Sequence, residues 1–149
     1  MATTVAIRPF VDDDLDAIVA TVRRVIEETY ADLLTGPAPV DASTRFWRGA
    51  VVAETAGGVV GVGRRVDDYV SDLWVAASMR GEGVGATLLD ALEGRMRRDG
   101  VTVARLRVVT ANTDARRFYR RAGWVETRRY PHERDGHMMT DMEKRLSVL

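Results

Sequence analysis

The chain has 149 residues, 46% of them hydrophobic, a length and composition suited to one globular domain with its own core. Its 22 basic and 22 acidic side chains give a formal net charge of zero, so no overall field attracts nucleic acid or an anionic membrane. Cysteine is absent, which excludes disulfides, thiolate metal sites and an acyl-cysteine intermediate.

The first half of the chain predicts a strand, a long helix and an antiparallel meander. After a short strand at 5–7, acidic residues from Asp12 to Asp16 suit the positive end of a helix and precede any useful apolar run. We therefore expect no signal peptide, no membrane span and a cytoplasmic location. Apolar residues at three- and four-residue steps predict a helix over 15–33 with one buried stripe. A short helical piece at 43–48 and strands at 50–54, 59–66 and 69–75 follow.

The second half predicts alternating helices and strands. A glycine-rich loop at 80–86 opens a helix that closes near Asp99, and a strand follows at 103–109. Asn112 supplies the cap of a helix that Gly123 stops. Strands at 124–130 and 138–146 flank a loop, and no linker interrupts the order, so we predict one mixed α/β domain over 1–149.

The junction between the strand at 69–75 and the next helix is typical of a phosphate site. Glycines adopt positive φ without a Cβ, so successive amides can face one anion at the positive end of the helix dipole. Lys144 is the only lysine and no P-loop motif is present. Gly81, Gly83 and Ala86 satisfy a dinucleotide fingerprint, but the strand at 103–109 ends without an acidic residue for a ribose. A plain helix cap is the alternative interpretation.

The two histidines, His132 and His137, lie five residues apart beside Glu133 and Asp135. Their spacing differs from that of a helical H-E-x-x-H pair, and Asp135-Gly136 indicates a hairpin turn. We therefore predict no metal site.

Several motifs together resemble the GCN5-related N-acetyltransferase (GNAT) family. They are the strand Ser71-Asp72-Leu73-Trp74-Val75, the Arg80 to Ala86 loop, Leu88-Leu89, and Asn112 through Trp124 as N-x-x-A-x-x-F-Y-x-x-x-G-W. The resemblance implies a mixed, mostly antiparallel central sheet splayed into a V and flanked by about four helices. It also implies acetyl-coenzyme A as the cofactor.

The resemblance assigns the cofactor contacts as follows. Backbone groups of Leu73, Trp74 and Val75 pair with the pantetheine arm. Asn112 contacts pantetheine, a role that can coexist with capping a helix. The pyrophosphate lies on the loop amides of Arg80, Gly81, Glu82, Gly83, Val84, Gly85 and Ala86.

The expected reaction is direct attack of an amine on the thioester in a ternary complex. Tyr119 matches the family tyrosine beside the coenzyme sulfur, although an aromatic on the core face is the structural alternative. A phenol of pKa near 10 is about 2 kcal/mol too weak an acid for a thiolate near 8.5, so hydrogen bonding matters at least as much as protonation. Asp72 is the preferred base or water-orienting carboxylate. Alternatively, Asp72 is a charged surface residue without a catalytic role. The fallback bases are Glu28, Glu54 and Glu133.

The acceptor pocket of the family lies between the end of the first helix, the following segment and the last hairpin loop. The candidates there are Glu28, Tyr30, Trp47, Tyr130, His132 and Glu133, with Glu27, Asp32 and Phe46 nearby. Carboxylates beside aromatic rings suit a cationic amine on a small molecule or peptide. The sequence leaves homodimerisation open. Two alternatives also remain open, a non-catalytic coenzyme-A-binding sensor or interaction domain and a nucleotide-binding module of another fold.

Overall fold

A mixed sheet of seven strands is the main feature of residues 4–147, the part of the chain that this computed structural model describes. The strands are β1 Ala6–Pro9, β2 Val51–Thr55, β3 Gly58–Val66, β4 Tyr69–Val75, β5 Val103–Val109, β6 Val125–Pro131 and β7 Met138–Arg145. They follow the order β1-β2-β3-β4-β5-β7-β6. The β4–β5 pair is parallel, whereas the β1–β2, β2–β3, β5–β7 and β6–β7 pairs are antiparallel. The predicted mixed, mostly antiparallel sheet is thus confirmed.

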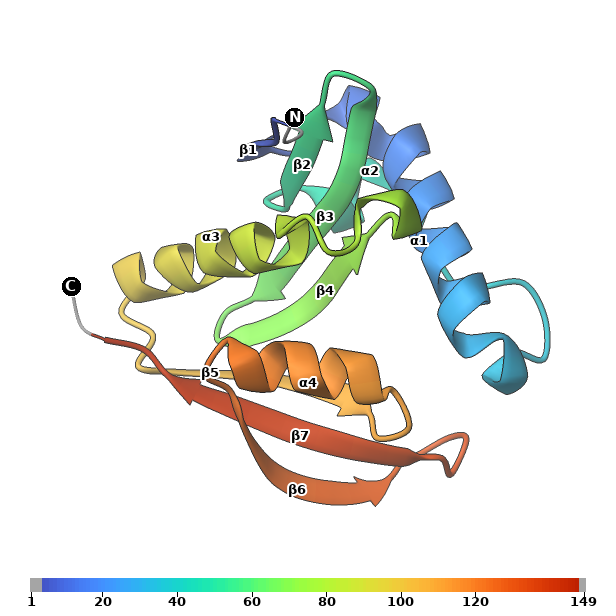
Figure 1. Ribbon diagram of the computed structural model, residues 1–149, viewed down its shortest axis with the longest axis vertical. Coiled ribbons are helices and arrows are strands. Elements are labelled where there is room, and N and C mark those ends of the chain that lie inside the picture. Colours follow the sequence, from blue (N-terminus) through green and yellow to red (C-terminus); the bar gives the residue numbers. More distant parts are fainter. Residues whose placement is uncertain (1–3, 148–149) are drawn as a thin grey trace. The chain divides into compact units, whose positions relative to one another are not determined.

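Helices accompany the strands (Figure 1). The chain divides into two compact units. The α-helices are α1 Leu15–Tyr30, α2 Thr44–Trp47, α3 Val84–Arg98 and α4 Thr113–Arg121. The first unit contains the residues up to Arg65 and Ser71–Leu92. The second contains Val66–Val70 and the residues from Glu93 onward.

The core of the first unit joins the apolar stripe of α1 to the strands. Ile18 and Val22 of α1 are at most 2% exposed, and Val52 and Val62 of the strands are fully buried. All four belong to one cluster with Trp47 of α2. The stripe predicted for α1 is therefore the face that the helix buries.

The acidic segment lies at the start of α1, as predicted, but one of its acids is buried. Asp12–Asp14 forms a 3-10 turn that leads into α1, and Asp14, the N-cap residue of that helix, is buried. Its two carboxylate oxygens accept hydrogen bonds from Arg8 at 2.9 Å each. These bonds lower the pKa of Asp14 below its ordinary value. The ion pair with Arg8 of β1 therefore explains why an aspartate occupies this buried position.

Two glycines of β3 let α3 approach the strands closely. A Cβ on Gly61 would lie 3.0 Å from both the Leu88 Cδ1 atom and the Trp74 carbonyl oxygen. A Cβ on Gly63 would lie 3.1 Å from the Leu92 Cδ1 atom. Because a backbone oxygen cannot yield as a side chain can, Gly61 is the stricter requirement. This packing fixes the start of α3 against β3 and β4.

The second unit consists of the β5–β7–β6 strands with α4 alongside them (Figure 1). A partly buried ion pair stabilises this unit. Glu93 accepts hydrogen bonds from Lys144 Nζ at 2.7 Å and from Trp124 Nε1 at 3.3 Å. Lys144 also donates to the Ala122 carbonyl oxygen at 2.7 Å. The only lysine of the chain is therefore committed to structure.

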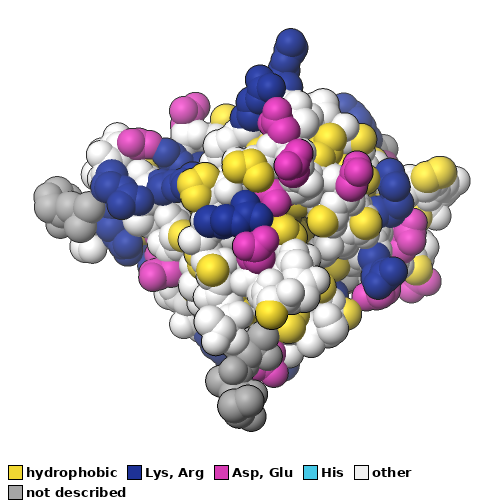
Figure 2. Space-filling model, turned by 90° about the horizontal axis from the view of Figure 1, so that it is seen from above, with side chains coloured by type: hydrophobic (Ala, Val, Ile, Leu, Met, Phe, Trp, Pro, Cys, Tyr) yellow, Lys and Arg dark blue, Asp and Glu magenta, His cyan; other side chains and the backbone are white. Residues whose placement is uncertain are grey.

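The face of the molecule shown in Figure 2 carries basic and acidic side chains interspersed with scattered apolar ones. This distribution agrees with the formal net charge of zero. Among residues 4–147, no helix is both long enough and apolar enough to cross a bilayer.

Candidate functional site

The loop between β4 and α3 has the conformation that its glycines predict. After a 3-10 turn at Ala77–Met79, Gly81 and Gly83 adopt φ of +81° and +79°. A Cβ at either glycine would meet nothing within 4 Å. The positive φ, and not crowding by neighbours, is therefore what requires glycine in this loop.

The amides of this loop fall into two groups. Arg80 N–H donates to Ala77 O at 3.2 Å and Glu82 N–H donates to Met79 O at 3.4 Å, so both are used inside the turn. Within residues 4–147, the remaining amides from Gly81 to Ala86 donate to no backbone acceptor. Donors of this kind at a helix N-terminus, in an exposed loop, form a natural anion site.

Asp72 on β4 is held by two neighbours of the first unit. Its Oδ2 atom accepts from Arg64 Nη1 at 3.2 Å and its Oδ1 atom accepts from Trp74 Nε1 at 3.0 Å. The side chains of Arg64 and Asp72 are 20% and 15% exposed. Asp72 is therefore a fixed, ion-paired carboxylate rather than the surface charge of the alternative reading.

Arg64 is a part of this site that the sequence analysis missed. Its Nε donates to the Phe46 carbonyl oxygen at 3.0 Å, and its guanidinium lies 3.8 Å from the centroid of the Phe46 ring. Arg64 thereby links α2, β3 and β4 through one planar group. Leu73, Trp74 and Val75 beside it are half-buried.

The acceptor candidates of the first unit differ in exposure. Glu28 is exposed near the end of α1 and Tyr30, the last residue of that helix, is half-buried. Trp47 is 1% exposed and its Nε1 donates to Asp41 O at 2.8 Å, so it is a core residue without surface for a substrate. Glu54 is paired with Arg8, whose hydrogen bonds lower its pKa, and is a poor base.

In the second unit, Tyr119 lies on the helix that the motif predicts, and Asn112 directly precedes that helix. Asn112 Oδ1 accepts from Ala115 N–H at 3.1 Å and so caps α4. Tyr119 is 8% exposed, with its ring edge-on to Phe118 and Trp124 at centroid distances of 5.1 and 5.9 Å. The ring of Tyr119 therefore packs in the core, which accounts for its aromatic character.

The acceptor candidates of the last hairpin are engaged in pairs. Tyr130 donates its hydroxyl proton to Asp141 Oδ1 at 2.7 Å. Arg107 binds both oxygens of Glu133 at 3.1 and 3.3 Å and lowers the pKa of that carboxyl to about 2. Glu133 is therefore a poor general base. His132 begins the loop and is mostly buried, with 15% of its side chain exposed.

Comparison with known proteins agrees with this architecture. Residues 43–146 match the acetyltransferase (GNAT) domain family. No curated protein matches the sequence.

Three solved structures share the fold. A GCN5-related N-acetyltransferase from Rhodopseudomonas palustris aligns with a TM-score of 0.77 and 23% identity over 98% of this chain and 99% of that one. The yncA structure from Salmonella typhimurium, solved with its cofactor acetyl-CoA, aligns with a TM-score of 0.76 and 22% identity over 96% of this chain and 94% of that one. The ribosomal-protein-S18-alanine N-acetyltransferase from Escherichia coli has a TM-score of 0.73 and 19% identity, over 98% of this chain and 96% of that one. Because the family match spans more than half of the chain, this protein belongs to the GNAT acetyltransferase family.

Proposed function

We propose that the protein transfers an acetyl group from acetyl-CoA to a primary amine of a small molecule or peptide. The observation that carries the proposal is the junction of β4 and α3. Gly81 and Gly83 adopt positive φ there, and the loop amides without a backbone acceptor fit a pyrophosphate, with Gly81, Gly83 and Ala86 exposed. The amides of Arg80 and Glu82 serve the turn, so the remaining amides up to Ala86 are the proposed donors.

The chemistry follows from the absence of cysteine. The neutral amine nitrogen attacks the thioester carbonyl carbon, and the tetrahedral intermediate then collapses with cleavage of the C–S bond. The amine loses one proton and the leaving thiolate gains one, so the products are an amide and free coenzyme A. No acetyl-enzyme forms on this route.

Tyr119 is the proposed donor to the leaving sulfur, from its place in the family motif. A hydrogen bond that strengthens as negative charge develops on sulfur lowers the barrier without tightening coenzyme binding. This role needs only the hydroxyl, because the ring already packs in the core.

Asp72 is proposed to orient a water molecule that receives the proton of the amine. Arg64 and Trp74 each occupy one of its oxygens, but a carboxylate offers about four acceptor sites. Relay through water avoids breaking the ion pair with Arg64. Exposed carboxylates near the end of α1, Glu27 and Glu28, support an acceptor that carries positive charge.

A non-catalytic coenzyme-A-binding domain is the second candidate, favoured by the pairing of Asp72 with Arg64. Thermal melting with acetyl-CoA, coenzyme A, NAD and ATP separates the classes. Acetyl-CoA should raise the melting temperature more than NAD or ATP. An amine panel monitored with a thiol reagent then separates enzyme from sensor, without protein background because the chain has no cysteine. Binding without release of coenzyme A by any amine would favour the sensor, and no binding would reject both.

A further inference from the structure

The loop between β6 and β7 holds its ends in a fixed register. His132 N–H donates to His137 O at 2.7 Å, and Gly136 N–H donates to His132 O at 3.0 Å. Gly136 adopts φ of +73°, as the predicted hairpin turn requires. The two histidines of the chain are thereby brought opposite each other.

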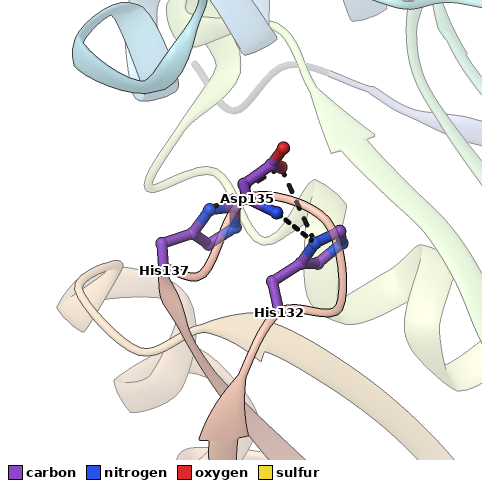
Figure 3. Close-up of side chains that lie close together, drawn as sticks. All are labelled: His132, Asp135 and His137. Carbon is purple, nitrogen blue, oxygen red and sulfur yellow. Dashed lines mark hydrogen bonds and ion pairs between the residues drawn. The ribbon is translucent and has the colours of Figure 1, made fainter.

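The side chains of this loop form a compact cluster of metal-ligand type (Figure 3). The imidazole rings of His132 and His137 stack at a centroid distance of 5.0 Å and an interplanar angle of 16°. Both side chains are mostly buried, with 15% and 22% exposed. One oxygen of Asp135 lies 3.7 Å from the Nδ1 atom of each ring, and one ligand atom from each residue lies within 4.8 Å of the others.

These spacings suit a shared ion better than direct hydrogen bonds. A hydrogen bond between imidazole and carboxylate would be about 2.7–3.2 Å long, shorter than the 3.7 Å that separates Asp135 from each ring. Two ligands on one zinc ion, each about 2.0–2.1 Å from it in tetrahedral geometry, are about 3.4 Å apart. Asp135 is 62% exposed, so its side chain can rotate to close the difference.

We propose that His132, Asp135 and His137 bind a divalent transition-metal ion, with Zn²⁺ as the type case. Two imidazoles and one carboxylate suit zinc, nickel, cobalt or copper, whereas magnesium and calcium prefer oxygen ligands. Three ligands leave at least one coordination position for water. This proposal departs from the sequence prediction of no metal, which rested on the non-helical spacing of the histidines and on the hairpin turn at Asp135-Gly136.

The two ring nitrogens of His132 differ in their hydrogen-bond partners. Its Nδ1 atom accepts hydrogen bonds from the amides of Arg134 and Asp135 at 3.1 and 3.3 Å. Ligation through Nδ1 replaces these bonds, and ligation through Nε2 keeps them. Glu133 lies 3.8 Å from Nε2 but is held by Arg107, so it is not a fourth ligand here.

The test uses the full chain without a histidine tag, because a tag would itself bind the metal. The chain has no cysteine and no histidine besides His132 and His137, so no other imidazole or thiolate competes for the ion. Zn²⁺ is titrated calorimetrically, Co²⁺ is followed by its visible absorption, and both imidazoles are observed by NMR. We expect saturable 1:1 binding, a Co²⁺ spectrum of nitrogen and oxygen ligands, and changes in both imidazole signals. Mg²⁺ should produce none of these.

Variants assign the ligands. His137→Ala and Asp135→Asn should each weaken Zn²⁺ affinity by about tenfold or more. Asp90→Asn, an exposed carboxylate of α3, is the matched control and should leave the affinity unchanged. Lowering the pH from about 7.5 to about 5.5 should also weaken binding, because protons compete for imidazole. Unchanged imidazole signals at saturating Zn²⁺, or wild-type affinity in folded His137→Ala and Asp135→Asn, would overturn the proposal.

Discussion

Gly83 and Gly100, one on each side of α3, offer a matched pair of alanine variants. Their φ values are +79° and +83°, and a Cβ at either position would meet nothing within 4 Å. Alanine should therefore cost about 1 kcal/mol of backbone strain at both positions. For a chain of this size, that cost lowers the melting temperature by about 2–4 °C.

Only Gly83→Ala should affect the cofactor. Its strain falls on the loop whose amides we propose as pyrophosphate donors, and its Cβ would project from the backbone that an anion has to approach. We expect the Kd for acetyl-CoA to rise about tenfold or more, equivalent to about 1.4 kcal/mol, while Gly100→Ala keeps the wild-type Kd. Calorimetric titration measures the Kd and thermal unfolding measures the stability.

Wild-type acetyl-CoA affinity in Gly83→Ala would refute this reasoning. The result would mean that Gly83 serves only to start α3. A loss of affinity in Gly100→Ala as large as that in Gly83→Ala would likewise show that global destabilisation, and not the loop, controls binding.

Three further predictions test other parts of the structure. Tyr119→Phe should lower kcat and kcat/KM together by about ten- to a thousandfold with little change in coenzyme affinity or melting temperature; full turnover would return the residue to packing alone. Gly61→Ala should cost about 1–3 kcal/mol by denaturant unfolding because of the Trp74 carbonyl 3.0 Å away, and a neutral effect would contradict the packing. Because Arg8 lowers the pKa of folded Asp14, their pair stabilises the protein above the ordinary carboxyl pKa and stops doing so as the pH falls through the lowered value. Asp14→Asn should therefore cost about 1–2 kcal/mol at neutral pH, and this cost should shrink as the pH falls below the ordinary carboxyl pKa.

The elements most accurately predicted from sequence were those with local signals at both ends. The strands Tyr69–Val75 and Val103–Val109 have the predicted bounds, because turn residues flank both apolar runs. The first helix was predicted to residue 33, but α1 ends at Tyr30 and continues as a 3-10 turn over Ala31–Leu33. Apolar spacing does not distinguish the last α-helical turn from a 3-10 turn.

The site residues that sequence reasoning missed depend on long-range contacts. Arg64 is one of many arginines, and nothing local indicates its ion pair with Asp72 or its stacking on Phe46. Arg107 and Glu133 are 26 residues apart, so the sequence could not indicate the ion pair that keeps this carboxyl ionised. Gly61 has a local signal, a glycine inside a strand, which marks a close approach of backbone.

Transfer of labelled acetyl from acetyl-CoA to an amine is the most direct test of the proposed activity. Acetyl-CoA carrying ¹³C in its acetyl group is incubated with the protein and a panel of amines, and products are identified by mass and by released coenzyme A thiol. The absence of cysteine and the engagement of the only lysine keep background thiol and self-acetylation low. We expect labelled amide and free coenzyme A in equal amounts from at least one amine, and no acetyl-enzyme. Coenzyme A release that is unaffected by every amine, with no labelled amide, would contradict the account.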